Sequence, residues 1–419
     1  MSRAERDIDS PYAWFRLGVA LVLCTIGGVG MWSVVVALPA VQAEFGVARA
    51  DASLPYTLTM IGFGFGSIAL GRLADRLGVM VPVLLGAATM ALGYGAAGAA
   101  SSLWLYALAQ GVLIGGGSAA TFGPLLADTS HWFERRRGIA IGIFASGNYL
   151  AGALWSPLTE QLIATYGWRH ASFAMAALCA ATMLPLALLL RRRAPNHAAA
   201  DDDTSTPARA PVTRRTPDSL GLSPQALQAL LVVAGVCCCV AMSMPQVHLV
   251  AYCGDLGYGP ARGAQMLSVM LVCGIVSRLG FGLLSDRIGG LRTLIVGSFL
   301  QGVALLLFLP FDGLVSLYVI AGLFGLFQGG IVPAYTIIIR EYFSPAQAGG
   351  RIGAVLTATL FGMALGGWMS GAVFDLTGSY RAAFINGIAW NLANLSIAGF
   401  LLRRQNQAPG RAVQLQAEG

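Results

Sequence analysis

Long apolar runs separated by short polar turns fill almost the whole chain. A membrane-spanning helix needs about 20 mostly apolar residues, and twelve runs are long enough to supply one. They lie near residues 16–39, 52–73, 79–100, 103–127, 136–162, 168–190, 225–253, 261–284, 290–310, 313–339, 347–375 and 379–402. The pattern predicts an all-α membrane protein with twelve transmembrane helices.

One polar stretch interrupts this pattern midway along the chain. Residues 191–224 are charged, rich in Pro, Ala and Thr, and without apolar periodicity, which is typical of a flexible linker. The predicted organisation is an N-terminal tail (1–15), a first six-helix bundle (16–190), the linker (191–224), a second six-helix bundle (225–402) and a C-terminal tail (403–419).

The two predicted bundles repeat each other. GRLADRLG at 71–78 recurs as GLLSDRIG at 282–289, and GWRHASF at 167–173 recurs as GSYRAAF at 378–384. Both pairs have the same offset of 211 residues. A shared spacing indicates duplication. Duplicated bundles in the membrane place a substrate site at their interface, so we expect two pseudo-symmetric halves with a site between them.

The most informative feature of the composition is the distribution of the arginines. Only 11% of residues are charged, against about 25% in soluble proteins. All 26 basic residues are arginine; 21 lie on the linker side of the predicted helices, four lie on the opposite side, and Arg278 lies within a span. This asymmetry places the linker and both termini in the cytoplasm. It also accounts for the net charge of +7 without a nucleic-acid partner. We expect a monomer in the inner membrane of a bacterium, in contact with the lipid bilayer.

The sequence contains no motif for enzymatic chemistry. The seven cysteines lack metal-type CxxC spacing, and there is no phosphate-binding loop through which ATP could drive transport. We therefore expect no enzyme, no metal and no cofactor, and a solute gradient as the driving force.

The turn between the second and third helices carries a specific motif. It reads G-x-L-x-D-R-x-G, and its weaker copy follows helix eight. With these motifs the chain resembles the major facilitator superfamily over essentially its full length. The resemblance implies a secondary transporter that works by alternating access. The residues predicted to form its gate are Gly71, Asp75, Arg76, Gly78, Asp128, Asp286 and Arg287.

Two readings of this turn remain open. Arg76 could pair with a carboxylate on a neighbouring helix, such as Asp128, and the pair would hold one conformation closed. Alternatively, the turn is charged only because it follows the arginine asymmetry.

Within the superfamily, the chain is similar to the monocarboxylate porter and oxalate–formate antiporter branch. The similarity rests on HWFERRRGIAIGIFASG at 131–147, SRLGFGLLSD at 277–286 and PQVHLVAYCGDLG at 245–257. It implies a small organic anion as the substrate, with a monocarboxylate favoured. The chain departs from its relatives at Gly274, where animal carriers have an acidic residue one turn before the helix-eight arginine. It also lacks the lysines that relatives use.

Arg278 is the first candidate for substrate binding. A charge deep in a span costs at least ~2.5 kcal/mol, so this side chain should face a cavity or a partner. Its planar guanidinium matches a carboxylate bidentately. The alternative is that it extends to the membrane interface. His248 could bind substrate or accept a coupled proton, or it could be a packed histidine bonded to a carbonyl.

Four further polar residues lie mid-membrane on the predicted helices five and ten. They are Asn148, Tyr149, Gln328 and Tyr335. Polar groups at this depth need partners, so they either line the substrate cavity or link helices. Two other functions remain open: efflux of amphipathic compounds, and a non-transporting membrane sensor on the same scaffold.

Overall fold

The computed structural model describes residues 8–192 and 217–417, and all regular structure in that part of the chain is helical. Most of the predicted linker, residues 193–216, lies outside the described residues. The predicted domain boundaries therefore remain predictions. Residues 403–417, predicted as a tail, continue the last helix.

The first half contains six membrane spans, several of them interrupted. The first span is α1 (Pro11–Gly27) with α2 (Val29–Phe45), and it is followed by α3 (Arg49–Leu77) and α4 (Met80–Gly98). The fourth span consists of α5 (Leu103–Leu108), the π-helix η2 (Ala109–Gly115), α6 (Gly116–Ser118), the 3₁₀ turn η3 (Ala119–Thr121) and α7 (Gly123–His131). The last two spans come from α8 (Arg137–Leu178), which continues through η4 (Cys179–Met183) into α9 (Leu184–Leu188). The run from Arg137 to Leu188 is 52 residues long, and Gly167 divides it into two spans with a φ of 81°. A positive φ of this size is accessible mainly to glycine.

The second half repeats this plan after a short 3₁₀ turn, η6 (Pro217–Leu220). Its elements are α10 (Pro224–Asp255), α11 (Pro260–Ile288), α12 (Gly290–Leu307), α13 (Leu314–Gln328) with α14 (Ile331–Tyr342), α15 (Pro345–Thr377) and α16 (Tyr380–Ala417). With the break at Gly167, the eleven apolar stretches among the described residues supply twelve spans. The predicted all-α, twelve-helix class is confirmed.

The two signature turns adopt the same backbone conformation. Gly78 has φ 83° and ψ 165°, and Gly289 has φ 82° and ψ 166°. Each ends a helix of 29 residues. Side chains other than glycine are strained in this region, which explains why both copies of the motif end in glycine. The duplication seen in the sequence is thus also present in the backbone geometry.

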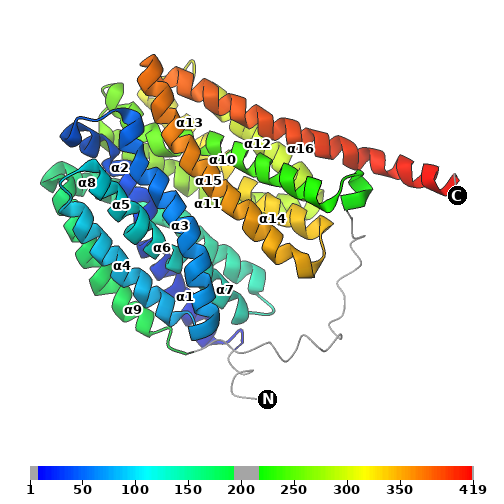
Figure 1. Ribbon diagram of the computed structural model, residues 1–419, viewed down its shortest axis with the longest axis horizontal. Coiled ribbons are helices and arrows are strands. Elements are labelled where there is room, and N and C mark those ends of the chain that lie inside the picture. The colour runs from blue at the N-terminus through cyan, green and yellow to red at the C-terminus, as the bar shows by residue number, and fades with distance from the viewer. Residues whose placement is uncertain (1–7, 193–216, 418–419) are drawn as a thin grey trace.

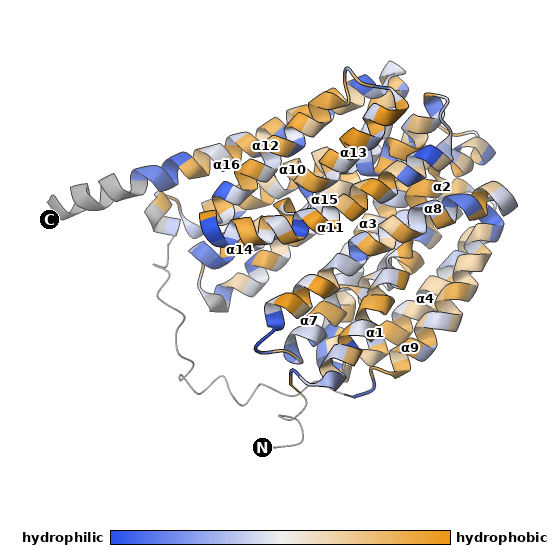
Figure 2. Cartoon of the chain, turned by 180° about the vertical axis from the view of Figure 1, so that it is seen from behind, coloured by the Kyte–Doolittle hydropathy of each residue, from blue (hydrophilic) through white to orange (hydrophobic). Residues whose placement is uncertain are grey.

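The helices run between two ends of the molecule (Figure 1). We call the end with the start of α1 and the two signature turns the terminal end, and the end with the α2–α3, α10–α11 and α15–α16 turns the far end. Apolar residues cover the flanks of the helices, and polar residues gather at their ends (Figure 2). That distribution is the one a bilayer requires.

The halves pack against each other through α3 on α15 and α8 on α11. Three hydrogen bonds join them near the middle, and each uses a helix carbonyl as its acceptor. The donors are Thr57, which bonds Ala364, Ser268, which bonds Ala153, and Arg278, which bonds Ala145. At the terminal end α3 and α15 diverge (Figure 1). The halves are therefore joined at the middle and the far end.

Candidate functional site

Arg278 lies on α11 in the contact between the two halves. Its Nη1 donates to the carbonyl of Ala145 on α8 at 2.9 Å, and its Cζ lies 4.6 Å from the centre of the Tyr149 ring. No carboxylate among the described residues forms an ion pair with it. Its Nε is buried and has no hydrogen-bond partner. The guanidinium is thus held by a carbonyl and an aromatic face, and its charge is not neutralised.

Tyr149 occupies space that would belong to a side chain at position 274. A Cβ built on Gly274 would lie 2.9 Å from Cε1 and 3.1 Å from Cδ1 of the tyrosine ring. The space one turn before Arg278 on α11 is therefore filled by an aromatic ring from the other half. Asn148 precedes Tyr149, and its carbonyl accepts a hydrogen bond from Trp32 at 3.2 Å. Its half-buried side chain has no hydrogen bond among the described residues.

The two candidates on the predicted helix ten are engaged within the second half. The Gln328 Oε1 accepts from Gln246 on α10 at 2.9 Å, while its Nε2 is buried without a partner. Tyr335 is fully buried and donates to Asn394 on α16 at 2.9 Å. Neither contacts Arg278 through a hydrogen bond. The sequence shows that these groups need partners, but it does not show on which side of the helix those partners lie.

His248 lies at the far end, away from Arg278 along the helices. Its Nε2 lies 2.8 Å from the carbonyl of Gly367, and its Nδ1 lies 3.2 Å from the hydroxyl of Tyr380. A carbonyl only accepts, so Nε2 carries the proton. The Tyr380 hydroxyl already accepts from Arg49 at 2.7 Å and therefore donates its own proton to Nδ1. Both ring nitrogens of a neutral imidazole are satisfied in this arrangement.

A carboxylate from the second half caps the first turn of α3. The two oxygens of Asp375 accept from the backbone N–H groups of Arg49 at 2.9 Å and Ala50 at 2.7 Å. The Arg49 side chain also pairs with Asp255 at 3.1 Å. Negative charge is favourable at a helix N-terminus, where these N–H groups have no intrahelical partner.

We refer to Arg49, Asp255, Asp375, Tyr380 and His248 together as the far-end latch. It joins α3 of the first half to α10, α15 and α16 of the second. Of its members, sequence reasoning singled out only His248. A signal did exist, because Arg49 is one of the four arginines on the side of the membrane that is otherwise almost free of them.

The predicted gate residues lie at the terminal end. Asp75, Arg76, Asp286 and Arg287 are exposed, and no ion pair within the described chain includes any of them. The suggested Arg76–Asp128 pair is absent from this structure. Asp128 is instead bonded by two nitrogens of Arg16, at 2.9 and 3.0 Å.

The Arg16–Asp128 pair forms because the two side chains meet inside the first half. Arg16 is on α1 and almost fully buried, and its guanidinium also lies 4.7 Å from the centre of the Trp132 ring. The signature turns themselves have the predicted glycine conformations, and their gating role remains a prediction.

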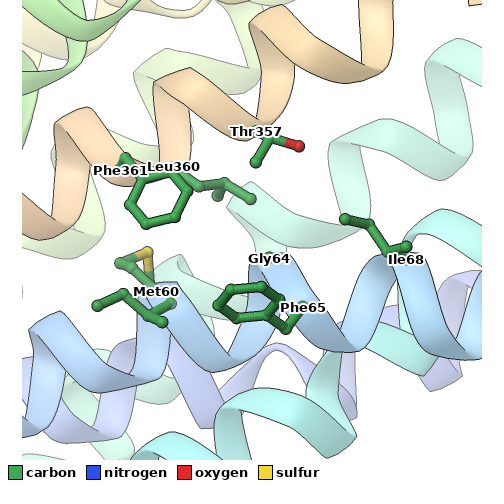
Figure 3. Close-up of a pocket in the computed structure, with 8 residues that line it drawn as sticks. Met60, Gly64, Phe65, Ile68, Thr357, Leu360 and Phe361 are labelled. Atoms are coloured by element: carbon green, nitrogen blue, oxygen red, sulfur yellow. The ribbon is translucent and has the colours of Figure 1, made fainter. Parts of the chain in front are cut away.

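A small pocket opens between α3 and α15 where these helices begin to separate (Figure 3). Met60, Phe65, Leu360 and Phe361 line it with apolar groups, and Thr357 adds one hydroxyl. It holds no cationic group, so the Thr357 hydroxyl is the one side-chain donor that it offers to a carboxylate. The Arg278 environment is the better candidate for an anion.

Comparison with known proteins agrees with this architecture. A sequence model of the Major Facilitator Superfamily matches residues 20–317 and, overlapping them, 266–418. The chain is 31% identical over 341 residues to monocarboxylate transporter 13 of Rattus norvegicus, covering 80% of this chain and 76% of the relative. It is 27% identical over 392 residues to monocarboxylate transporter 11 of Mus musculus, covering 90% and 84%. Among solved structures it resembles the nucleoside transporter NupG, with a TM-score of 0.66 at 16% identity over 94% of this chain and 99% of that one.

Proposed function

The chain belongs to the major facilitator superfamily, and from that premise we propose that this transporter carries a small organic anion, most simply a monocarboxylate. The observation that carries the proposal is the unneutralised guanidinium of Arg278 at the contact between the halves. Relatives named as monocarboxylate transporters support the same substrate class.

The geometry around Arg278 suits one carboxylate. Nη1 is engaged by Ala145, so Nε and Nη2 form the edge of the guanidinium that remains for a ligand. Two parallel N–H groups on one edge match the two oxygens of a carboxylate. Tyr149 supplies an aromatic wall beside the charge. One cation and an aromatic wall favour a monocarboxylate over a compact dianion, which would need a second cation.

We further propose that transport proceeds by alternating access, with the far-end latch closed in the conformation described here. The latch bonds cross between the halves, so the far end can open only after they break. Because these bonds close the far end, a site between the halves would be reached from the terminal end in this conformation. Rocking of one half against the other would then expose Arg278 to each side in turn.

The proposal is tested by uptake into liposomes, with and without an imposed pH gradient. We expect lactate or pyruvate to enter whether or not the gradient is present, because Arg278 lacks a carboxylate partner through which a proton could act. The His248→Ala variant should behave in the same way, since both ring nitrogens are engaged in the latch. Gradient-driven accumulation that His248→Ala abolishes would instead assign proton transfer to this histidine. Uptake of unrelated amphipathic compounds, but not of organic acids, would favour the efflux alternative.

We also propose that the terminal end faces the cytoplasm, so that both termini and residues 191–224 lie inside the cell. The support is the arginine asymmetry, with 21 arginines on this side and four on the other. Protease added to intact spheroplasts should leave the chain uncut between the halves, whereas lysed cells should release two fragments. Cleavage in intact spheroplasts would reverse the orientation.

A further inference from the structure

Gly274 lies one helical turn before Arg278, in the buried contact between α11 and α8. A methyl group added here would approach the Tyr149 ring to 2.9 Å, which is closer than real side-chain carbons come. The missing side chain therefore leaves a notch in α11, and the ring of Tyr149 fills it.

The same ring carries the guanidinium. Tyr149 is 7% exposed, and the Cζ of Arg278 lies 4.6 Å from its centre. Ala145, one turn earlier on α8, accepts the hydrogen bond from Nη1 at 2.9 Å. One turn of α11, from 274 to 278, thus lies against one turn of α8, from 145 to 149. The Tyr149 ring, against the face of the guanidinium, and the Ala145 carbonyl, bonded to Nη1, hold the cation in place.

We propose that Gly274 is a positioning residue for anion binding. By leaving the notch open, it seats the Tyr149 ring against the Arg278 guanidinium and directs the Nε–Nη2 edge of that cation to the substrate carboxylate. It also keeps an internal carboxylate away from the position one turn before Arg278. The cation therefore stays available to an anionic ligand from outside the protein. This inference rests on the proposed function, because it concerns how the proposed anion site is built.

The first test compares two glycines of the same helix. Gly280 is six residues beyond Gly274, and a Cβ there would meet nothing within 4 Å. Binding of lactate and pyruvate to purified protein is measured from the dependence of the melting temperature on ligand concentration. We expect Gly274→Ala to raise the Kd at least tenfold, and Gly280→Ala to leave it within twofold of wild type. Equal affinities for Gly274→Ala and wild type would overturn the proposal.

A second test separates positioning from a general packing defect. Tyr149→Phe keeps the ring and should bind almost as wild type does, whereas Tyr149→Leu should lose about as much affinity as Gly274→Ala. If Gly274 acts through the ring, then adding Gly274→Ala to Tyr149→Leu should cause little further loss. Additive losses in this double-mutant cycle would show that the glycine acts on packing elsewhere and would reject the proposal.

These measurements also distinguish failure of the proposed function from failure of the positioning role. Wild-type protein that binds neither lactate nor pyruvate, nor any other small organic acid, would contradict the proposed function itself, and the positioning role would fall with it. Wild-type binding that is unaffected by Gly274→Ala would contradict only the positioning role.

Discussion

Arg278→Ala is expected to abolish measurable binding of small organic acids while leaving the protein folded in the membrane. Among the described residues, the Arg278 guanidinium is the one cation in the middle of the contact between the halves, and its Nε–Nη2 edge has no hydrogen bond there. Loss of a bidentate bond between two charged groups costs about 3 kcal/mol, which is roughly a hundredfold in Kd. Affinity should be measured by the concentration dependence of the melting temperature.

Two variants make this result specific. Arg278→Lys should recover only part of the affinity, because an ammonium lacks the planar fork and does not stack on Tyr149 in the same way. Arg262→Ala removes a positive charge from the exposed start of the same helix and should leave the Kd unchanged. Wild-type affinity in Arg278→Ala would mean that the charge serves the protein interface rather than the substrate.

The second large effect is expected at the far-end latch. Asp375→Asn removes the charge that caps α3 and leaves only one oxygen to accept two backbone N–H groups. A charged helix cap stabilises by about 1–2 kcal/mol, so the balance between closed and open far ends should shift roughly tenfold toward open. Tyr380→Phe should act in the same direction, because its hydroxyl joins Arg49 to His248.

This shift can be measured as a distance between spin labels. Residues 51 and 262 are exposed at the far end, on α3 and α11 of opposite halves. We expect one short distance in the otherwise native protein and a second, longer population in both latch variants. Asp312→Asn is the matched control, since Asp312 is an exposed far-end carboxylate whose side chain forms no hydrogen bond among the described residues. An unchanged distance distribution in Asp375→Asn would remove the latch from the gating mechanism.

The parts of the molecule that could be predicted from sequence are those with local signals. The twelve spans follow from the length of apolar runs, and the turns at Gly78 and Gly289 follow from a repeated motif whose glycines need a positive φ. The position of Arg278 between the halves agrees with the cost of burying a charge in lipid.

The contacts that escaped prediction join residues far apart in the chain. Arg49 meets Tyr380 across 331 positions and Asp255 across 206. Neither the length of an apolar run nor a sequence motif shows which helix faces meet at the interface between the halves. Asp128 shows the same limit, because Arg76 was its predicted partner and only the fold shows that Arg16 pairs with it. Tyr335 was a candidate for the substrate cavity because of its depth in the membrane. That depth does not distinguish the interior of one half from the cavity between the two halves.

The carbonyl acceptors of the three central bonds have a consequence for the speed of opening. Ala145 and Ala364 are helical and have a residue with an N–H four positions on, so these two carbonyl oxygens use only their second lone pair for the other half. Ala153 differs, because the residue four positions on is Pro157, which has no N–H, and Ser268 of the other half donates to this carbonyl instead. When the halves part, the oxygens of Ala145 and Ala364 keep their helical hydrogen bonds, whereas the oxygen of Ala153 loses the bond from Ser268. Thr57 also has an acceptor in its own helix, the carbonyl of Ser53 at 3.3 Å. Two of the three central acceptors therefore remain satisfied when the halves separate, and the barrier to rocking falls mainly on the Ser268–Ala153 bond and on the charged contacts at the far end.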